Sequence, residues 1–351
     1  MSYLAKPKVH HPALAKNAVG LTRRDYEGSI TTLCAGCGHD SITAAIIQAF
    51  WELDVEPHKV AKLSGIGCSS KTPAYFLKEA HGFNSVHGRM PAVATGAGAA
   101  NGELMLIGVS GDGDSLSIGL GQLCHVMRRN LNLLYILENN GVYGLTKGQF
   151  SASSDAGSTS KKGETNTMAP IDGVLLALTL GATFVARSFS GDKEQLVPIL
   201  KAGLMHKGFA FVDVISPCVT FNDHEGSTKS YAYTREHQIE VVQADFVMPR
   251  DEITAAYDPG SELRVKLHDG GFVQLRKVAE DYDPTDRDRS YAHIRALQSE
   301  GVVATGLLYV SESSVDMHDQ LGTIPQALTN IPHSDLCPGS EALAKLQERF
   351  R

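Results

Sequence analysis

Polar side chains follow two apolar runs in a pattern suited to a divalent cation and a diphosphate. Gly111-Asp112-Gly113-Asp114 comes directly after the apolar run 104–110, and Asn139-Asn140 comes after the run 131–137. Mg²⁺ prefers oxygen ligands and takes phosphate oxygens as well. Glycines let backbone N–H groups approach phosphate closely. We therefore expect Asp112, the Asn140 side-chain oxygen and the Val142 carbonyl to hold Mg²⁺.

Four of the six cysteines lie in segments expected to be loops. Cys34 and Cys37 form a CxxC pair ahead of a helical segment, Cys68 follows a short apolar run, and Cys218 follows the run 209–215. Four thiolates at one edge of a sheet suit a [4Fe–4S] cluster or a tetrahedral Zn²⁺, and a CxxC pair alone also suits dithiol redox chemistry. Spacing does not decide between iron and zinc. Cys124, inside an apolar helical segment, is expected to be a buried structural thiol, and Cys337 an incidental one.

The elements that must position these residues alternate between strand and helix. Such alternation is typical of an α/β fold with a mainly parallel sheet and helices on both faces, and ligands bind such sheets at the carboxyl ends of the strands. We expect helices over 40–53, 91–101, 115–129, 171–180 and 193–206, strands over 60–66, 104–110, 131–137, 183–187 and 209–215, and a hairpin over 265–275 that turns at 268–271.

Composition narrows the class of protein further. The 351 residues carry a formal charge of −7 and show no basic stripe, which argues against a nucleic-acid-binding protein. The N-terminus has no secretory pattern and no apolar run is long enough to span a membrane, so we expect a cytoplasmic protein. We expect an N-terminal surface arm (1–30), a cofactor-binding domain (31–220) and a C-terminal extension (221–351) with a charged loop at 281–289.

The Gly-Asp-Gly tripeptide alone is a common turn, but the full strand–GDG–helix–strand–Asn-Asn order is more specific. It resembles the thiamine-diphosphate motif shared by thiamin enzymes. Together with the cysteine motifs, it closely resembles the β subunit of 2-oxoacid:ferredoxin oxidoreductases. The motifs that carry this resemblance are Cys34-Ala-Gly-Cys37-Gly-His39, Gly65-Ile-Gly-Cys68-Ser-Ser70, His87-Gly-Arg89, the 111–114 run with Ile118-Gly119, and 140–149.

The run 221–231 further resembles the 2-oxoglutarate branch of that family. One departure is Asn139, where many relatives carry Asp. The resemblance implies a thiamin-diphosphate-binding fold that holds thiamine diphosphate, Mg²⁺ and one [4Fe–4S] cluster. It also implies oxidative decarboxylation of 2-oxoglutarate to succinyl-CoA and CO₂, reversibly, with electrons passed through the cluster to ferredoxin.

The resemblance assigns site residues by position. His39, Lys71 and Lys147 are the expected catalytic residues, and the two lysines would bind the distal carboxylate of 2-oxoglutarate, because an unpaired buried carboxylate is costly. The expected cofactor-binding residues are Gly67, Ser69, His87, Gly111, Asp112, Gly113, Asp114, Asn140, Val142, Gly144, Leu145 and Thr146, and the cluster ligands are Cys34, Cys37, Cys68 and Cys218.

The glutamate that activates thiamin has no counterpart in this chain. The resemblance implies that an α subunit supplies it, together with part of the substrate and coenzyme A site, in an (αβ)₂ assembly that acts on ferredoxin. Two other readings remain open from the sequence. One is the β subunit of an oxidoreductase for pyruvate or another 2-oxoacid, and the other is a zinc-stabilised, non-catalytic binding protein.

Overall fold

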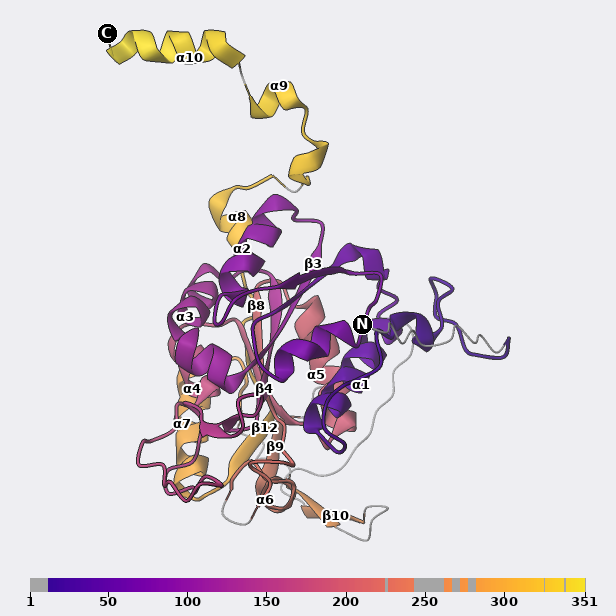
Figure 1. The fold of residues 1–351 in the computed structure, drawn as a ribbon, viewed down its shortest axis with the longest axis vertical. Helices are drawn as coiled ribbons and strands as arrows, with labels where there is room; N and C mark the ends of the chain where they lie inside the picture. Colours follow the sequence, from indigo (N-terminus) through magenta and orange to yellow (C-terminus); the bar gives the residue numbers. More distant parts are fainter. Residues whose placement is uncertain are drawn as a thin grey trace.

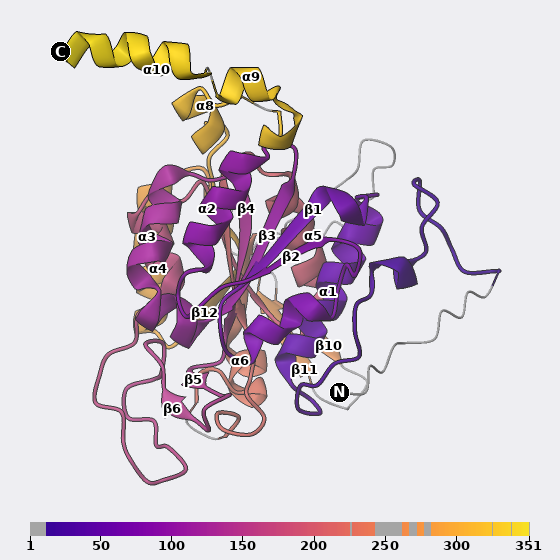
Figure 2. The same cartoon turned by 45° about the horizontal axis from the view of Figure 1, so that its top comes forward.

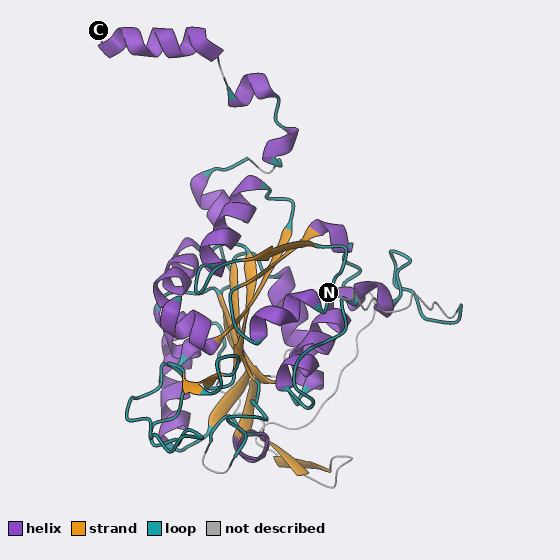
Figure 3. Cartoon of the chain, viewed as in Figure 1, coloured by secondary structure: helices purple, strands orange, loops and turns teal. Residues whose placement is uncertain are grey.

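A parallel sheet with helices on both faces forms the body of the protein (Figures 1 and 3). The computed structural model describes residues 12–224, 227–242, 262–266, 272–276, 282–324, 326–337 and 339–350. In sheet order, the strands are β2 (His81–Asn84), β1 (Val60–Ser64), β3 (Met105–Gly111), β4 (Leu133–Asn139), β8 (Phe209–Ile215), β7 (Phe184–Phe189), β12 (Val303–Val310) and β9 (Gln238–Val242).

Neighbouring strands run parallel throughout this sheet except where β12 pairs antiparallel with β7. All seven residues of β4 are buried, as expected for a strand covered on both faces. Leu133, Tyr135 and Leu137 pack into one core, and Leu134 and Ile136 pack into the other. The alternation of side chains along a strand therefore divides the apolar core between the two faces of the sheet.

Helices cover both faces of the sheet (Figures 1 and 2). Aspartates begin several of them: Asp172 accepts hydrogen bonds from two backbone N–H groups of α4, and Asp192 accepts one from α5. The first face carries α1 (Gly38–Glu52) and α5 (Lys193–Met205); the second carries α2 (Met90–Ala100), α3 (Leu120–Arg129), α4 (Gly173–Thr179) and α7 (Arg287–Ser299).

The expected α/β order is confirmed, with differences at particular elements. The single helix expected over 115–129 is wrong: a π-helix over 113–118 comes first, and α3 begins at Leu120. The charged loop expected over 281–289 is shorter, because α7 already begins at Arg287. Strands β10 (Glu262–Lys266) and β11 (Phe272–Arg276) pair antiparallel as the hairpin predicted, and its turn at 268–271 lies outside the described residues.

The two ends of the chain also differ from expectation. Tyr26 is fully buried, and Glu27 forms a bridge with Phe76, so this stretch of the expected surface arm is packed against the body, while most of residues 12–20 are exposed. Because β9 and β12 join the main sheet, that sheet continues across the proposed boundary at residue 220. No described helix is long and apolar enough to cross a bilayer.

Short elements complete the described chain. Helices α9 and α10 stand away from the body at the C-terminal end (Figures 1 and 2), and α10 is exposed along its length. The remaining elements are β5 (Val142–Tyr143), β6 (Gln149–Phe150), α6 (Tyr231–His237), α8 (Met317–Leu321), α9 (His333–Leu336), α10 (Gly339–Gln347) and 3₁₀ turns over 23–26, 57–59, 69–74, 328–330 and 348–350.

Candidate functional site

The carboxyl ends of β3 and β4 bring the predicted magnesium ligands together. The two strands are parallel neighbours, with Gly111 opposite Glu138, so the residues that follow them meet at one edge of the sheet. Asp112 and Asn140 are 1% and 6% exposed. The Asn140 side-chain oxygen accepts a hydrogen bond from the Val142 N–H at 3.0 Å and keeps a second lone pair for another partner.

Asp112 is held by hydroxyl groups from a neighbouring loop. Its Oδ2 accepts hydrogen bonds from Ser151 and from Ser153, the latter at 2.6 Å. Burial raises the pKa of the Asp112 carboxyl, and these hydrogen bonds oppose that rise. A buried carboxylate beside an amide oxygen and a backbone carbonyl is an all-oxygen donor set, which fits Mg²⁺.

Close contacts explain the two glycines of this motif. A Cβ atom on Gly111 would lie 2.8 Å from the Ser69 hydroxyl, and one on Gly113 would collide with the Tyr143 ring. The Tyr143 hydroxyl also donates to the Gly113 carbonyl at 3.0 Å. Larger residues would therefore push the loops apart, so glycine is needed for the backbone to stay close to what the loops enclose.

Asp114 holds two loops together. Its carboxylate accepts hydrogen bonds from the Ser110 hydroxyl at 2.7 Å and from the Gly88 N–H at 2.8 Å. The exposed His87 ring lies 3.5 Å from the same carboxylate. The loops at 65–66 and 87–88 are thereby fixed at the rim of the site, so Asp114 organises its surroundings, and direct cofactor contact by Asp114 or His87 stays a prediction.

The four predicted cluster ligands come from loops at this same edge. Cys37 precedes α1 and donates its N–H to the Cys34 carbonyl at 3.0 Å. A Cβ atom on Gly144 would lie 3.4 Å from the Cys68 sulfur and 3.7 Å from the Cys218 sulfur. Residues separated by up to 184 positions are thus gathered around one point, and the glycine at 144 leaves room between two of the sulfurs.

The environment of these thiols disfavours their ionised form. Burial raises the pKa of Cys37 to about 12, and burial also raises the pKa of Cys68. The nearby Cys218 raises both further, because neighbouring thiolates repel each other. Thiolates in this setting need compensating positive charge, which a metal centre supplies.

Both a cluster and a single zinc ion remain predictions for these thiols. Among the residues that the structure describes, no three His, Cys, Asp or Glu side chains form a metal-binding group. A tetrahedral Zn²⁺ draws its thiolates to about 4 Å from one another, whereas each thiolate of a [4Fe–4S] cluster binds a separate iron. Outside this set, Cys124 is half-buried, not fully buried as expected, and Cys337 is exposed.

His39 lies in the protein interior beside a buried glutamate. Its Nδ1 is 2.6 Å from the Ser216 hydroxyl and 3.6 Å from Glu138, whose carboxyl also accepts a hydrogen bond from Thr72. Burial lowers the pKa of His39 to about 4 and raises the pKa of Glu138 well above its usual range. His39 is therefore neutral near pH 7. No sequence pattern singles out Glu138, which looks like an ordinary strand residue.

The two predicted substrate lysines occupy different loops at the rim. Lys71 is half-buried in the 69–74 turn, and its charge lowers the pKa of Cys68, which places it near that thiol. Lys147 is exposed and has a φ of +80° in the turn between β5 and β6. A lysine in this left-handed conformation is uncommon, and such strain is often kept for function.

The other predicted residues lie in these same loops. Ser69 is buried beside Gly111, Gly67 has a φ of +138°, and Leu145 is 50% exposed. The Thr146 hydroxyl donates to Gln149 at 2.6 Å within the turn. The structure therefore gathers these residues at one edge without testing what each of them binds.

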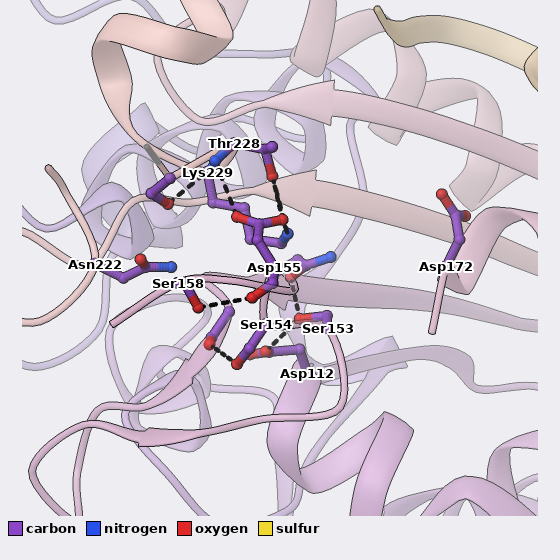
Figure 4. Close-up of polar contacts among 12 residues, drawn as sticks. Asp112, Ser153, Ser154, Asp155, Ser158, Asp172, Asn222, Thr228 and Lys229 are labelled. Carbon is purple, nitrogen blue, oxygen red and sulfur yellow. Dashed lines mark hydrogen bonds and ion pairs between the residues drawn. The ribbon is translucent and has the colours of Figure 1, made fainter. Parts of the chain in front are cut away.

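A set of polar residues not predicted from the sequence lies behind the predicted magnesium ligands (Figure 4). Ser151, Ser153 and Ser154 face the two ligand loops. From beyond residue 220, Asn222 donates to the Asn140 carbonyl at 2.8 Å, and Lys229 pairs with Asp155 at 3.1 Å. In the sequence, only the run Ser151-Ala-Ser-Ser154, soon after Asn139-Asn140, could have indicated these polar residues.

A cavity of about 500 Å³ lies beside these residues. Asn139 and Ser153 line it next to the predicted magnesium ligands, and Arg187 lines it too and pairs with Asp172 and Asp213 at 2.9 Å. The cavity lies along the carboxyl ends of β4, β8 and β7. Charged groups of both signs line it, so its charge alone does not select a ligand.

Comparison with known proteins agrees with this geometry. Residues 65–214 match the family model "Thiamine pyrophosphate enzyme, C-terminal TPP binding domain". The chain is 41% identical over 220 residues to 2-oxoglutarate oxidoreductase subunit KorB of Mycobacterium tuberculosis, an alignment that spans 60% of this chain and 58% of the relative. It is 35% identical over 291 residues to 2-oxoacid:ferredoxin oxidoreductase subunit beta of a Sulfolobus species, covering 78% of this chain and 92% of that one.

A solved structure shares the fold as well. The 2-oxoglutarate:ferredoxin oxidoreductase from Magnetococcus marinus, with 2-oxoglutarate, coenzyme A and succinyl-CoA bound, superposes with a TM-score of 0.71 and 31% identity. The match covers 88% of this chain and 91% of the solved one. The chain has a thiamine-pyrophosphate-binding domain and a sheet edge lined by cysteines, and it matches these relatives over most of its length. It therefore belongs to the β subunits of 2-oxoacid:ferredoxin oxidoreductases.

Proposed function

We propose that this chain is the β subunit of a 2-oxoglutarate:ferredoxin oxidoreductase that converts 2-oxoglutarate and coenzyme A to succinyl-CoA and CO₂. Two electrons leave to ferredoxin, and the reaction is reversible. The chain would carry thiamine diphosphate, Mg²⁺ and one [4Fe–4S] cluster. The runner-up is the same chemistry on pyruvate or another 2-oxoacid.

One observation carries the proposal: a single loop serves both predicted centres. Ser69 lies against Gly111 of the diphosphate motif, while the adjacent Cys68 lies against Gly144 together with Cys218. A cofactor held at the first position and a cluster held at the second would be immediate neighbours. Such proximity suits electron transfer from a thiamin-bound substrate to a cluster.

The residues of this chain have distinct tasks in that arrangement. Asp112, Asn140 and the Val142 carbonyl would hold Mg²⁺, and through it the diphosphate. Bound thiamine diphosphate supplies the nucleophilic carbon that accepts the 2-oxoacid and stabilises the electrons left when CO₂ departs. The buried His39 is neutral near pH 7, so it would add no charge of its own beside the metal, the thiolates and the substrate.

The substrate assignment depends on two lysines. The distal carboxylate of 2-oxoglutarate needs a cation, and pyruvate has no such group. Lys71 and Lys147 flank the loops of the predicted site, and Lys147 occupies a backbone position that glycine adopts more easily. Retention of a lysine there supports a role for its charge.

The chain would act only with a partner. An α subunit would supply the carboxylate that activates thiamin and part of the coenzyme A site. Ferredoxin would dock on the edge that carries Cys34, which is exposed.

Anaerobic co-purification with an α subunit tests the proposal. The expected complex is brown, contains about four irons and one thiamin per β chain, and reduces a viologen with 2-oxoglutarate in preference to pyruvate when coenzyme A is present. The β chain alone should bind thiamine diphosphate without turnover. A colourless complex with one zinc and no thiamin would instead support a binding protein, and a preference for pyruvate would support the runner-up.

A further inference from the structure

We propose that Ser153, assisted by Ser151, is a positioning residue that fixes the Asp112 carboxylate for Mg²⁺. This inference rests on the proposed function, because it takes Asp112 as a metal ligand. Both hydroxyls reach the same carboxylate oxygen from the serine loop, defined here as residues 151–155. Figure 4 shows Ser153 beside Asp112. Ser153 is 2% exposed, so water does not readily replace its hydrogen bond.

Ser153 links the loops that follow both strands. Its hydroxyl lies 2.6 Å from Asp112 Oδ2, after β3, and 2.8 Å from Asn139 Oδ1, at the end of β4. The hydroxyl has one proton, and a carboxylate is the stronger acceptor of the two. Ser153 therefore donates to Asp112, and its oxygen lies against the Asn139 amide oxygen.

Asn139 is oriented from its other side. Its Nδ2 donates to the Asp213 carboxylate at 3.1 Å, and Asp213 in turn accepts a hydrogen bond from Arg187 at 2.9 Å. Because the amide nitrogen faces Asp213, the amide oxygen must face Ser153. This chain of contacts reaches from the metal ligand across β4 and β8 to β7, all of which are rigid parts of the sheet.

The serine loop is itself anchored on two sides, by the loop that carries Gly141 and by residues 228–229. Ser154 donates to the Gly141 carbonyl, next to the Asn140 ligand. Asp155 accepts hydrogen bonds from the Thr228 hydroxyl at 2.6 Å and the Thr228 N–H at 2.9 Å, and it pairs with Lys229 (Figure 4). The loop cannot easily shift to compensate for a lost hydroxyl, so its removal should be felt at Asp112.

Metal affinity gives the direct test. The αβ complex is stripped with a chelator, and Mg²⁺ is titrated by calorimetry in the presence of saturating thiamine diphosphate. Loss of a residue that orients a metal ligand typically weakens binding about 10- to 100-fold. We expect Ser153→Ala to show this loss and Ser151→Ala to show a loss in the same direction.

Ser158→Ala is the matched control. Ser158 belongs to the same polar region, but its hydroxyl donates to the Asp155 carbonyl and not to Asp112. Its Mg²⁺ affinity should stay within twofold of the parent. The melting temperature of each metal-free complex separates a positioning effect, which leaves that temperature unchanged, from general disruption. If Ser153→Ala does not fold, Ser151→Ala carries the same measurement.

The outcomes separate this inference from the proposed function. A parent complex that binds Mg²⁺ with thiamine diphosphate, together with alanine variants that bind equally well, would overturn the positioning role while leaving the function intact. A parent complex that binds neither would overturn the function, and this inference with it.

Discussion

Replacing Lys147 with glycine should stabilise the protein while impairing its use of 2-oxoglutarate. Lys147 is exposed and has a φ of +80°, so it contributes little packing and occupies a strained conformation. An L-residue in the left-handed region costs about 1–2 kcal/mol, and the extra freedom of glycine in the unfolded chain takes back about 0.4–1 kcal/mol. We expect a net gain of about 0.5–1 kcal/mol in the free energy of unfolding.

The effect on catalysis should have the opposite sign. A hydrogen bond to a charged group contributes about 1.5–3 kcal/mol. Losing it at the distal carboxylate should lower kcat/KM for 2-oxoglutarate about 10- to 150-fold. Pyruvate lacks that carboxylate, so its kcat/KM should change less than twofold. A more stable protein with a selective loss cannot be explained by misfolding.

Two controls isolate the strain from the charge. Lys147→Ala removes the charge but keeps a side chain at positive φ, so it should show the same catalytic loss without the gain in stability. Lys162→Ala removes a charge from an exposed position nearby in sequence and should change neither property. The assay is viologen reduction by the anaerobic αβ complex, with stability followed by urea unfolding. If Lys147→Gly kept both its 2-oxoglutarate kcat/KM and its preference over pyruvate, the proposed role of this lysine would be wrong.

Three further predictions follow from the site. Cys218→Ser should lower the iron content well below about four per chain, whereas Cys124→Ser should leave it unchanged; equal iron in both would exclude Cys218 as a ligand. Asn139→Asp places a carboxylate against Asp213, whose oxygen lies 3.1 Å from the present Asn139 amide nitrogen. The substitution should lower the free energy of unfolding by about 1–3 kcal/mol, and the loss should grow as the pH rises. Urea unfolding between pH 5 and 8 measures this loss. The pKa of His39 is about 4 when folded and near 6.5 when unfolded, so protonation of the unfolded chain should cost about 2 kcal/mol between pH 7 and 5. His39→Gln should remove that loss, and an unchanged pH slope would contradict it.

The fold was largely predictable because its strands are long apolar runs separated by amphipathic helices. The run 131–137 predicted β4 to within two residues, since a strand buried on both faces has a distinctive composition. The π-helix over 113–118 was not predictable, because periodicity does not distinguish it from the first turns of an α-helix. Burial of Tyr26 was also missed, since it depends on a surface that distant residues form.

The candidate site was predictable only where the chain itself brings residues together. Asp112 and Asn140 follow neighbouring parallel strands, so their proximity follows from the topology. The hydroxyls of Ser151 and Ser153 depend on how a loop folds back across the sheet edge, and Asn222 reaches the same place from beyond the expected boundary. Periodicity in the sequence does not reveal how a loop folds or where a distant segment packs. These residues could therefore not be predicted from the sequence.

The pairing of β12 with β7 has a consequence for how the protein is made. All four predicted cluster cysteines have been synthesised by residue 218, but the edge of β7 stays unpaired until residues 303–310 emerge from the ribosome. An unpaired strand edge invites pairing with other chains. Insertion of iron before that point would occur on an open sheet, so we expect a nascent chain to complete its sheet first and to mature its metal centre afterwards.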